Sequence, residues 1–153
     1  MRPEERDDLR ALLTEAYQPY ANDMPPEVYE PFLAGILDTE RGRQFVAVDG
    51  DTVLGGARLY PPGLTRMPIP SDWAWVRAVG VRTSARRTGV ARRIMAYCAE
   101  NAGDVPALSL HTMDFMPDAI RLYERLGYER APDYDFVPPH GAFTALAYRL
   151  LLR

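Results

Sequence analysis

The sequence predicts a single α/β domain, spanning residues 1–153, that is built on a mixed β-sheet. Its length suits one domain, and a composition of 47% hydrophobic and 25% charged residues is ordinary for a chain with a packed core. Helical periodicity at the start gives way to β-rich segments, and strands and helices then alternate to the end. Asp49-Gly50 lies between two apolar runs, which predicts an antiparallel hairpin.

The first half of the chain is expected to contain two helices followed by the hairpin. Apolar residues recur at helical spacing in both helices, and an Asn- and Pro-containing breaker separates them. In order, the predicted segments are a helix at 4–18, a breaker at 22–26, a helix at about 27–37, strands at Gln44–Val48 and Thr52–Tyr60, and a Pro-rich loop at 61–70.

The second half is expected to alternate strand, helix, strand, helix and strand. Pro117 falls in the first turn of the second of these helices and Gly127 follows its end, which are favoured positions for both residue types. In order, the predicted segments are a strand at Trp73–Val81, a helix at 89–102, a strand at Ala107–Thr112, a helix at 117–126 and a strand at Phe143–Leu152.

Charge and cysteine content exclude several classes of function. The formal net charge is −3, whereas proteins that grip nucleic acid usually carry a basic excess, so no nucleic-acid partner is expected. Cys98 is the only cysteine, which rules out an intrachain disulfide and a cysteine-based zinc site, and no metal is expected. The start of the chain has no signal-like apolar run and no segment is long enough for a membrane span, so a cytoplasmic protein without a membrane partner is expected.

The pattern Arg86-x-x-Gly89-x-Ala91 marks the segment most indicative of chemistry. It follows a predicted strand and opens a predicted helix, whose first N–H groups lack intrahelical acceptors and lie at the positive end of the helix dipole. Small residues at positions 89 and 91 would let a diphosphate approach these N–H groups. The pattern is neither a P-loop nor a dinucleotide fingerprint, so it predicts an anion site of another kind.

This pattern resembles the R/Q-x-x-G-x-G/A pyrophosphate loop of the GNAT family of N-acetyltransferases. About 30 residues later, the segment 119–128, AIRLYERLGY, resembles the family's A-x-x-L-Y-x-x-x-G-F, and the likeness extends over about residues 4–152. The resemblance implies the GNAT fold, in which two parallel strands splay apart, here Trp73–Val81 and Ala107–Thr112. It also implies acetyl-coenzyme A as acyl donor and transfer to an amine of a small molecule or peptide, by direct attack in a ternary complex.

The resemblance implies a role for each matching residue. Tyr123 would protonate the departing thiolate, which is chemically reasonable because a phenol has a pKa near 10 and a thiol near 8.5. Main-chain groups on the strand before the loop would pair with the pantetheine arm, and backbone N–H groups of the loop would hold the diphosphate. The implied coenzyme-binding residues are Val79, Val81, Arg86, Arg87, Thr88, Gly89, Val90, Ala91 and Arg92.

The sequence departs from the family pattern in three places. Met116 stands where many members have an Asn that contacts the coenzyme. The strand Trp73–Val81 carries Arg77 where many members carry a general-base Glu. Only Met1 and Arg2 precede the first Pro, so the family's usual first strand is expected to be missing or very short.

The missing carboxylate leaves the proton acceptor open between His111, Asp114 and a water chain. His111 titrates nearest to neutrality and is our hypothesis for the catalytic base, although a structural role is an alternative for it. Cys98 lies in an apolar helix stripe and is interpreted as structural, which favours direct attack over an acyl-cysteine. Tyr17, Tyr20 and Tyr29 are candidates for the acceptor pocket.

Two further alternatives concern function and assembly. The missing carboxylate also fits a non-catalytic acyl-coenzyme A sensor or partner module that keeps the coenzyme site without turnover. Many members of the family pair, so a homodimer is an expectation, to which the apolar closing strand Phe143–Leu152 could contribute.

Overall fold

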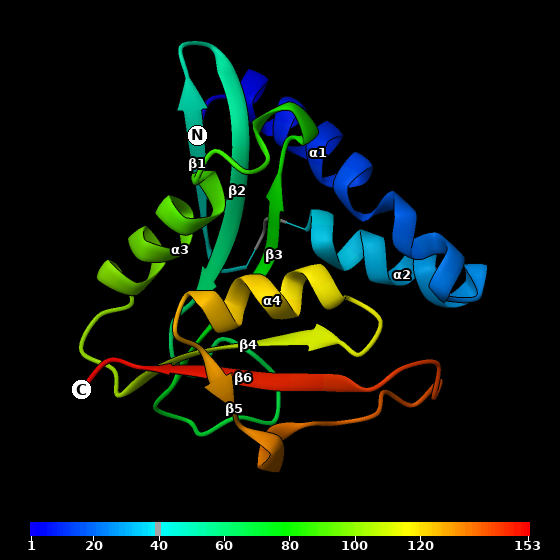
Figure 1. The fold of residues 1–153 in the computed structure, drawn as a ribbon, viewed down its shortest axis with the longest axis vertical. Helices are drawn as coiled ribbons and strands as arrows, with labels where there is room; N and C mark the ends of the chain where they lie inside the picture. The colour runs from blue at the N-terminus through cyan, green and yellow to red at the C-terminus, as the bar shows by residue number, and fades with distance from the viewer. Residues whose placement is uncertain (39–40) are drawn as a thin grey trace.

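The computed structural model describes residues 1–38 and 41–153 and has one mixed β-sheet, as the sequence predicts (Figure 1). The strand order across the sheet is β1-β2-β3-β4-β6-β5, and every neighbouring pair is antiparallel except β3 and β4. Met1 and Arg2 are in no strand, so the sheet begins with the hairpin. The strands are β1 Arg43–Asp49, β2 Thr52–Tyr60, β3 Ala74–Val81, β4 Ala107–Met113, β5 Glu129–Arg130 and β6 Ala145–Leu151.

Four α-helices and three short 3₁₀ segments complete the part of the chain that is described. Within this part, no helix has both the length and the apolar character that crossing a bilayer requires. The helices are α1 Pro3–Tyr17, α2 Pro26–Leu37, α3 Val90–Glu100 and α4 Pro117–Arg125, and the 3₁₀ segments are η1 Gln18–Asp23, η2 Thr83–Ala85 and η3 Pro132–Tyr134.

Helices α1 and α3 cover opposite faces of the sheet, and adjacent glycines on β2 allow both to approach closely. A Cβ built on Gly55 would lie 3.1 Å from Ile94 of α3, whereas one on Gly56 would lie 2.8 Å from Leu9 of α1. Successive residues of a strand point to opposite faces, so the two helices pack on opposite sides. Gly80 on β3 pairs with Gly56 and makes room for Leu13 of α1 in the same way.

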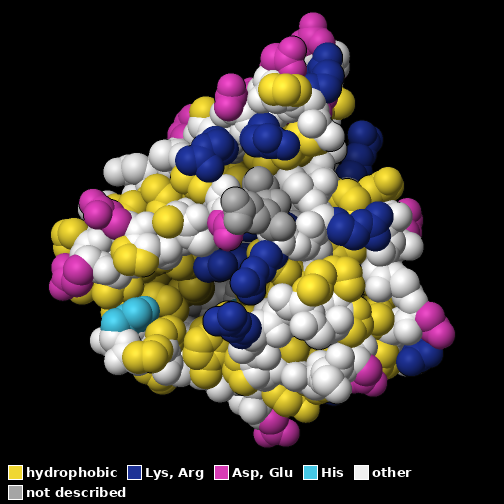
Figure 2. Space-filling view, turned by 180° about the vertical axis from the view of Figure 1, so that it is seen from behind, with side chains coloured by type: hydrophobic (Ala, Val, Ile, Leu, Met, Phe, Trp, Pro, Cys, Tyr) yellow, Lys and Arg dark blue, Asp and Glu magenta, His cyan; other side chains and the backbone are white. Residues whose placement is uncertain are grey.

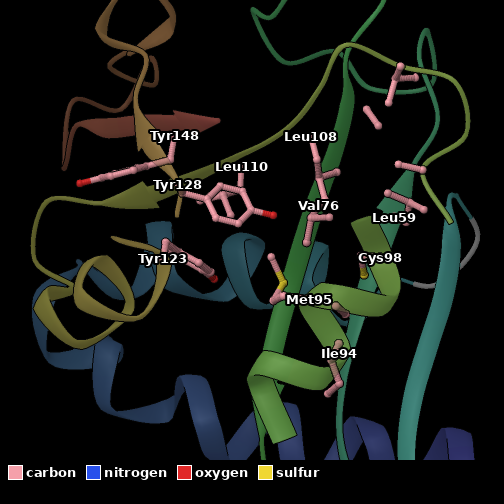
Figure 3. Packing of buried hydrophobic residues seen from close by; sticks show 14 of the residues in the cluster. Leu59, Val76, Ile94, Met95, Cys98, Leu108, Leu110, Tyr123, Tyr128 and Tyr148 are labelled. Atoms are coloured by element: carbon pink, nitrogen blue, oxygen red, sulfur yellow. The ribbon is translucent and has the colours of Figure 1, made fainter. Parts of the chain in front are cut away.

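The main hydrophobic core lies between the sheet and the layer formed by α3 and α4 (Figure 3). Figure 3 shows Ile94, Met95 and Cys98 of α3 on one side of this core and Tyr123 of α4 on the other. A second cluster lies under α1 and α2 and includes Leu9, Leu12, Leu13, Ile36, Val53 and Ala78. The two cores therefore hold helices on both faces of the sheet.

Strands β3 and β4 form the parallel pair that the sequence predicts, but they pair over a short distance. The ladder runs from Ala74 opposite Leu108 to Val76 opposite Leu110. Beyond Val76 the strands diverge, as Figure 1 shows, although β3 continues to Val81 and β4 to Met113. The register of β3 on β2 also shifts here, and Ala78 has a φ of 58°. The diverging halves of the two strands therefore border an opening in the sheet.

The differences from the sequence expectations are small and confined to short elements. The region after the first helix forms η1, which extends into the predicted breaker at 22–26, and α2 begins at the last residue of that breaker. The two-residue strand β5 was not predicted because two residues carry no periodicity. The predicted strand Phe143–Leu152 starts later, at Ala145, and lies between β4 and β5. Its apolar character therefore reflects burial inside the domain. The homodimer stays a prediction, without support from this strand.

Arg58 of β2 connects the sheet to the C-terminal end of α2. Its side chain is 0% exposed, and its guanidinium donates to the carbonyl of Ile36 at 2.8 Å and to that of Gly35 at 3.3 Å. It also donates to Oε1 of Gln44 at 3.2 Å. The last carbonyls of a helix lack intrahelical partners and carry partial negative charge, so they compensate this buried cation.

We predict that Arg58→Met lowers the free energy of unfolding by about 3 kcal/mol, because the carbonyls of Gly35 and Ile36 lose charged donors while buried. Urea denaturation followed by circular dichroism measures this change. Arg153→Ala is the control, since its ion pair with Asp104 is exposed and should contribute less than about 1 kcal/mol. Equal losses in the two variants would contradict the structural role of Arg58.

Candidate functional site

A cavity of about 1240 Å³ lies where β3 and β4 diverge. The first turn of α3, the inner side of α4, and parts of α1, η1 and α2 contribute to its wall. The cavity therefore reaches both sides of the sheet through the opening. Figure 2 shows basic and hydrophobic side chains gathered beside a hollow on the face opposite to that of Figure 1.

The segment 86–92 forms a turn that leads into α3. Gly89 precedes α3 with a φ of 85°, a left-handed conformation that suits glycine, and Arg87 also has a positive φ, of 64°. The first α-type hydrogen bond of the helix runs from the N–H of Arg93 to the carbonyl of Gly89, at 3.1 Å. The N–H groups at positions 90–92 therefore lack α-helical acceptors. A Cβ built on Gly89 would meet no atom within 4 Å, so the space beside this turn is open.

Eight of the nine predicted coenzyme-binding residues line the cavity. The exception is Thr88, whose hydroxyl donates to the carbonyl of Ala85 and so stabilises the turn. The eight are Val79, Val81, Arg86, Arg87, Gly89, Val90, Ala91 and Arg92.

Tyr17 of α1 holds the irregular part of β3 in place. Its hydroxyl donates to the carbonyl of Val79 at 2.9 Å, one residue after the positive φ of Ala78. Burial raises the pKa of Tyr17, so its hydroxyl remains a donor at any physiological pH. One lone pair of the Val79 carbonyl, a main-chain group included in the pantetheine prediction, is thus already used within the protein.

Tyr123 of α4 is buried and lines the same cavity. Figure 3 shows its side chain extending from α4 toward the core. Burial is the main reason that the pKa of Tyr123 is raised well above its usual value. The phenol is therefore protonated at neutral pH and has a proton to donate. Met116, which replaces the family's Asn, is buried at the start of α4 and takes a hydrogen bond on its sulfur from the Thr112 hydroxyl at 3.6 Å.

His111 on β4 has both ring nitrogens in hydrogen bonds. Nδ1 accepts from the indole N–H of Trp75 at 3.1 Å, and Nε2 lies 3.0 Å from the carbonyl of Tyr134, to which it donates. Burial lowers the pKa of His111, so the neutral ring is favoured. A neutral imidazole whose only acceptor nitrogen is occupied has no lone pair free to take a proton. This geometry favours a structural role for His111 over the base role.

Aromatic side chains form the wall of the cavity near α1, η1 and α2. The ring of Tyr17 packs against Tyr20 and Phe32 at centroid distances of 5.8 and 5.9 Å, and Phe32 packs against Phe143 at 6.4 Å. Tyr17 and Tyr20, two of the candidates for the acceptor pocket, line the cavity here. Tyr29 lies behind them in the cluster around Phe143, with its hydroxyl buried and without a partner among the residues described.

Three other side chains clarify the chemistry. Cys98 is 0% exposed and burial raises its pKa to about 12, so it offers no thiolate. Asp114 is exposed and is not among the described residues that line the cavity. Arg77 of β3 does line it, at the strand where the family commonly has a carboxylate. From the sequence, Arg77 was notable only because it stands where many members of the family have a Glu. Nothing in the sequence indicated that its side chain lines the cavity.

Comparison with known structures agrees with this architecture. A GNAT-family acetyltransferase of Desulfovibrio desulfuricans is similar, with a TM-score of 0.74, 16% identity, and coverage of 99% of this chain and 95% of that chain. A GNAT protein of Kribbella flavida gives a TM-score of 0.67 with 24% identity, over 99% and 95% of the two chains. An aminoglycoside 6′-N-acetyltransferase complexed with coenzyme A gives 0.67 with 16% identity, over 99% and 93%.

Comparison by sequence identifies the family. A search of curated proteins found no match. The sequence model of the acetyltransferase (GNAT) family, however, matches residues 6–128, which include most of α1, all of α2 to α4 and the whole segment 86–92. The matched part is most of the chain. The chain therefore belongs to the acetyltransferase (GNAT) family.

Proposed function

We propose that this protein is a single-domain enzyme that transfers an acetyl group from acetyl-coenzyme A to an amine within a ternary complex. One observation carries the proposal: a single cavity is bordered both by the first turn of α3, with its open N–H groups, and by the hydroxyl of Tyr123. An anion site and a buried proton donor at one opening are what a coenzyme thioester requires.

The diphosphate of the coenzyme would bind at the segment 86–92. Backbone N–H groups and the dipole of α3 supply fixed positive potential there, and the open space beside Gly89 admits the phosphate oxygens. The pantetheine arm would then extend along the free half of β3, where Val79 and Val81 line the cavity. This places the thioester near the end of the opening, between β3 and α4.

The reaction that follows needs one nucleophile and one proton donor. The amine nitrogen attacks the thioester carbonyl carbon, the C–S bond breaks, and the hydroxyl of Tyr123 donates to the departing sulfur. The proton lost by the amine leaves through water in the cavity, from which Tyr123 recovers its own. Because Cys98 is buried and protonated, an acyl-cysteine intermediate has no support from its position.

The decisive experiment measures release of free coenzyme A from acetyl-coenzyme A with a panel of amines, amino acids and peptides. Turnover with any of them supports the enzyme, and its absence despite tight coenzyme binding by calorimetry would favour the sensor alternative. The missing carboxylate on β3 is the observation that favours the sensor, whereas the Tyr123 hydroxyl at the cavity favours the enzyme.

We predict that Gly89→Glu weakens coenzyme A binding far more than Arg87→Ala does. The carboxylate adds bulk and like charge beside the diphosphate, whereas one solvated Arg contributes modestly. Gly89→Ala is the matched control, because it introduces only the strain of a positive φ, about 1 kcal/mol. Calorimetric titration with coenzyme A gives the three affinities. Equal effects of Gly89→Glu and Arg87→Ala would show that the diphosphate binds elsewhere.

We predict that Tyr123→Phe lowers kcat by about 10²-fold while the affinity for coenzyme A stays within about threefold. The ring and its packing against Tyr128 are retained, and only the donor is lost. Because the pKa of Tyr123 is raised, wild-type activity should show no loss from its ionisation up to about pH 10. Steady-state kinetics across pH test both statements, and an unchanged kcat would remove Tyr123 from the mechanism.

We predict that His111→Gln keeps the shape of the pH–rate profile, because its accepting nitrogen is held by Trp75. Its effect should appear in stability. The folded pKa of His111 is below the unfolded value, so the unfolded chain binds the proton first and stability falls as pH drops below about 6.5. The variant should lack this part of the slope in thermal unfolding. A loss of about 10²-fold in rate, with loss of an inflection between pH 6 and 7, would instead identify His111 as the base.

A further inference from the structure

Arg77 is a half-buried cation on the side of the sheet that α1 and α2 cover. Its guanidinium is so close to α2 that a Cβ on Gly35 would lie 2.9 Å from it. Its Cζ lies 6.0 Å from the centroid of the Trp75 ring, and it contributes to the wall of the cavity. The side chain is therefore held between the sheet and α2 at the edge of the open space.

Within the described part of the chain, no carboxylate neutralises Arg77. The groups that act on its charge are the hydroxyl of Tyr60, which accepts a hydrogen bond from it, the hydroxyl of Tyr17, and the guanidinium of Arg58, which is itself positive. Burial lowers the pKa of Arg77. Two other partly buried arginines differ from it, because each has an acid: Arg82 pairs with Asp8 and Arg130 with Asp135.

A partly buried cation without a counter-ion costs free energy, so its presence needs a compensating partner. Arg58 has one in the C-terminal carbonyls of α2. Arg77 instead faces a cavity, which is where a ligand would supply the missing negative charge. Guanidinium is the group best suited to this task, because its fork of donors matches a carboxylate or phosphonate.

The rest of the cavity restricts the ligand further. Its two carboxylates, Glu27 and Asp118, are exposed at its margin, and Asp118 already pairs with Arg121. Deeper in, the wall next to Arg77 is aromatic and includes Tyr17 and Phe32. The interior thus combines one uncompensated cation with an apolar surface, which matches an anionic group attached to an apolar body.

We propose that Arg77 binds an oxyanion of the acyl acceptor, so that the acceptor is an amine carrying a carboxylate or similar group beside an apolar body, as an apolar α-amino acid does. The proposal rests on the proposed acetyl transfer, because it places the acceptor opposite the coenzyme. Arg77 precedes Val79 by two residues, about 7 Å along a strand, so an amine and a carboxylate separated by one or two carbons can reach the thioester and Arg77 together. The same cation disfavours polycationic acceptors.

The test uses matched probes that differ only in charge. L-Phenylalanine, L-leucine and L-methionine are each compared with their carboxamides as acceptors for the full-length protein and acetyl-coenzyme A. The variants are Arg77→Gln, which removes the charge, and Arg77→Lys, which keeps it without the fork. Arg121→Gln is the control, since Arg121 also borders the cavity but is exposed and paired with Asp118.

We expect the wild type to prefer the amino acids to their carboxamides. Arg77→Gln should lower kcat/KM for the amino acids by about 10- to 100-fold, mainly through KM, and change that for the carboxamides by less than about threefold. Arg77→Lys should retain part of the preference, and Arg121→Gln all of it. The melting temperature of Arg77→Gln should stay the same or rise, because an uncompensated charge is removed.

The outcomes separate this inference from the proposed function. Turnover of carboxamides or polyamines in preference to amino acids would overturn the role of Arg77 and leave the acetyltransferase intact. Absence of turnover with every amine, although coenzyme A binds, would reject the proposed function. In that case the anion site is tested by binding alone. Calorimetry measures the affinity of the coenzyme-loaded protein for N-acetyl-L-phenylalanine and for its amide. Binding that needs both the carboxylate and Arg77 supports the anion site, and equal binding of the two probes rejects it. If Arg77→Gln lowers the melting temperature by more than a few degrees, the role of Arg77 is structural instead.

Discussion

The short parallel ladder between β3 and β4 is the constraint on which the rest of this structure depends. After three residue pairs the strands diverge, and the backbone of β3 is freed from one neighbour while it stays paired to β2 on the other side. The irregular conformation at Ala78 and the hydrogen bond from Tyr17 to Val79 belong to this divergence. Without it the sheet would be continuous, and the two sides of the molecule would not share a cavity.

The opening gives the two faces of the sheet different physical characters. On the side of α3 and α4, fixed N–H groups and arginines make a positive surface suited to phosphate. On the side of α1 and α2, the cavity wall combines aromatic rings with the guanidinium of Arg77, which has no carboxylate partner among the described residues. In the function that we propose, two reactants would approach from opposite sides and meet at the gap. Tyr123 lies on the α4 side, where a leaving thiolate would be.

Arg58 and Arg77 show how position decides the role of one residue type. Both come from the middle of the sheet and lie next to α2, yet Arg58 points to the carbonyls that end this helix and Arg77 points to the cavity. The first cation is compensated by the protein and is part of its stability. The second has no carboxylate partner among the described residues, which makes it the clearest signal of a ligand in the structure. Because Arg77 stands where many members of the family have a Glu, an acceptor in this protein would meet a positive charge where it meets a negative one in those members.

The sequence by itself determined the fold and the open turn before α3, because both depend on local patterns. Periodicity predicted the principal helices and strands, Asp49-Gly50 predicted the hairpin, and Arg86-x-x-Gly89-x-Ala91 marked the open end of α3. Only the tertiary structure decided what surrounds each titratable side chain. His111 and Arg77 could not be interpreted in advance, because the partners of His111 come from β3 and η3 and those of Arg77 from α1, α2 and β2. Contacts between residues far apart in the chain set burial and charge, and no local spacing encodes them.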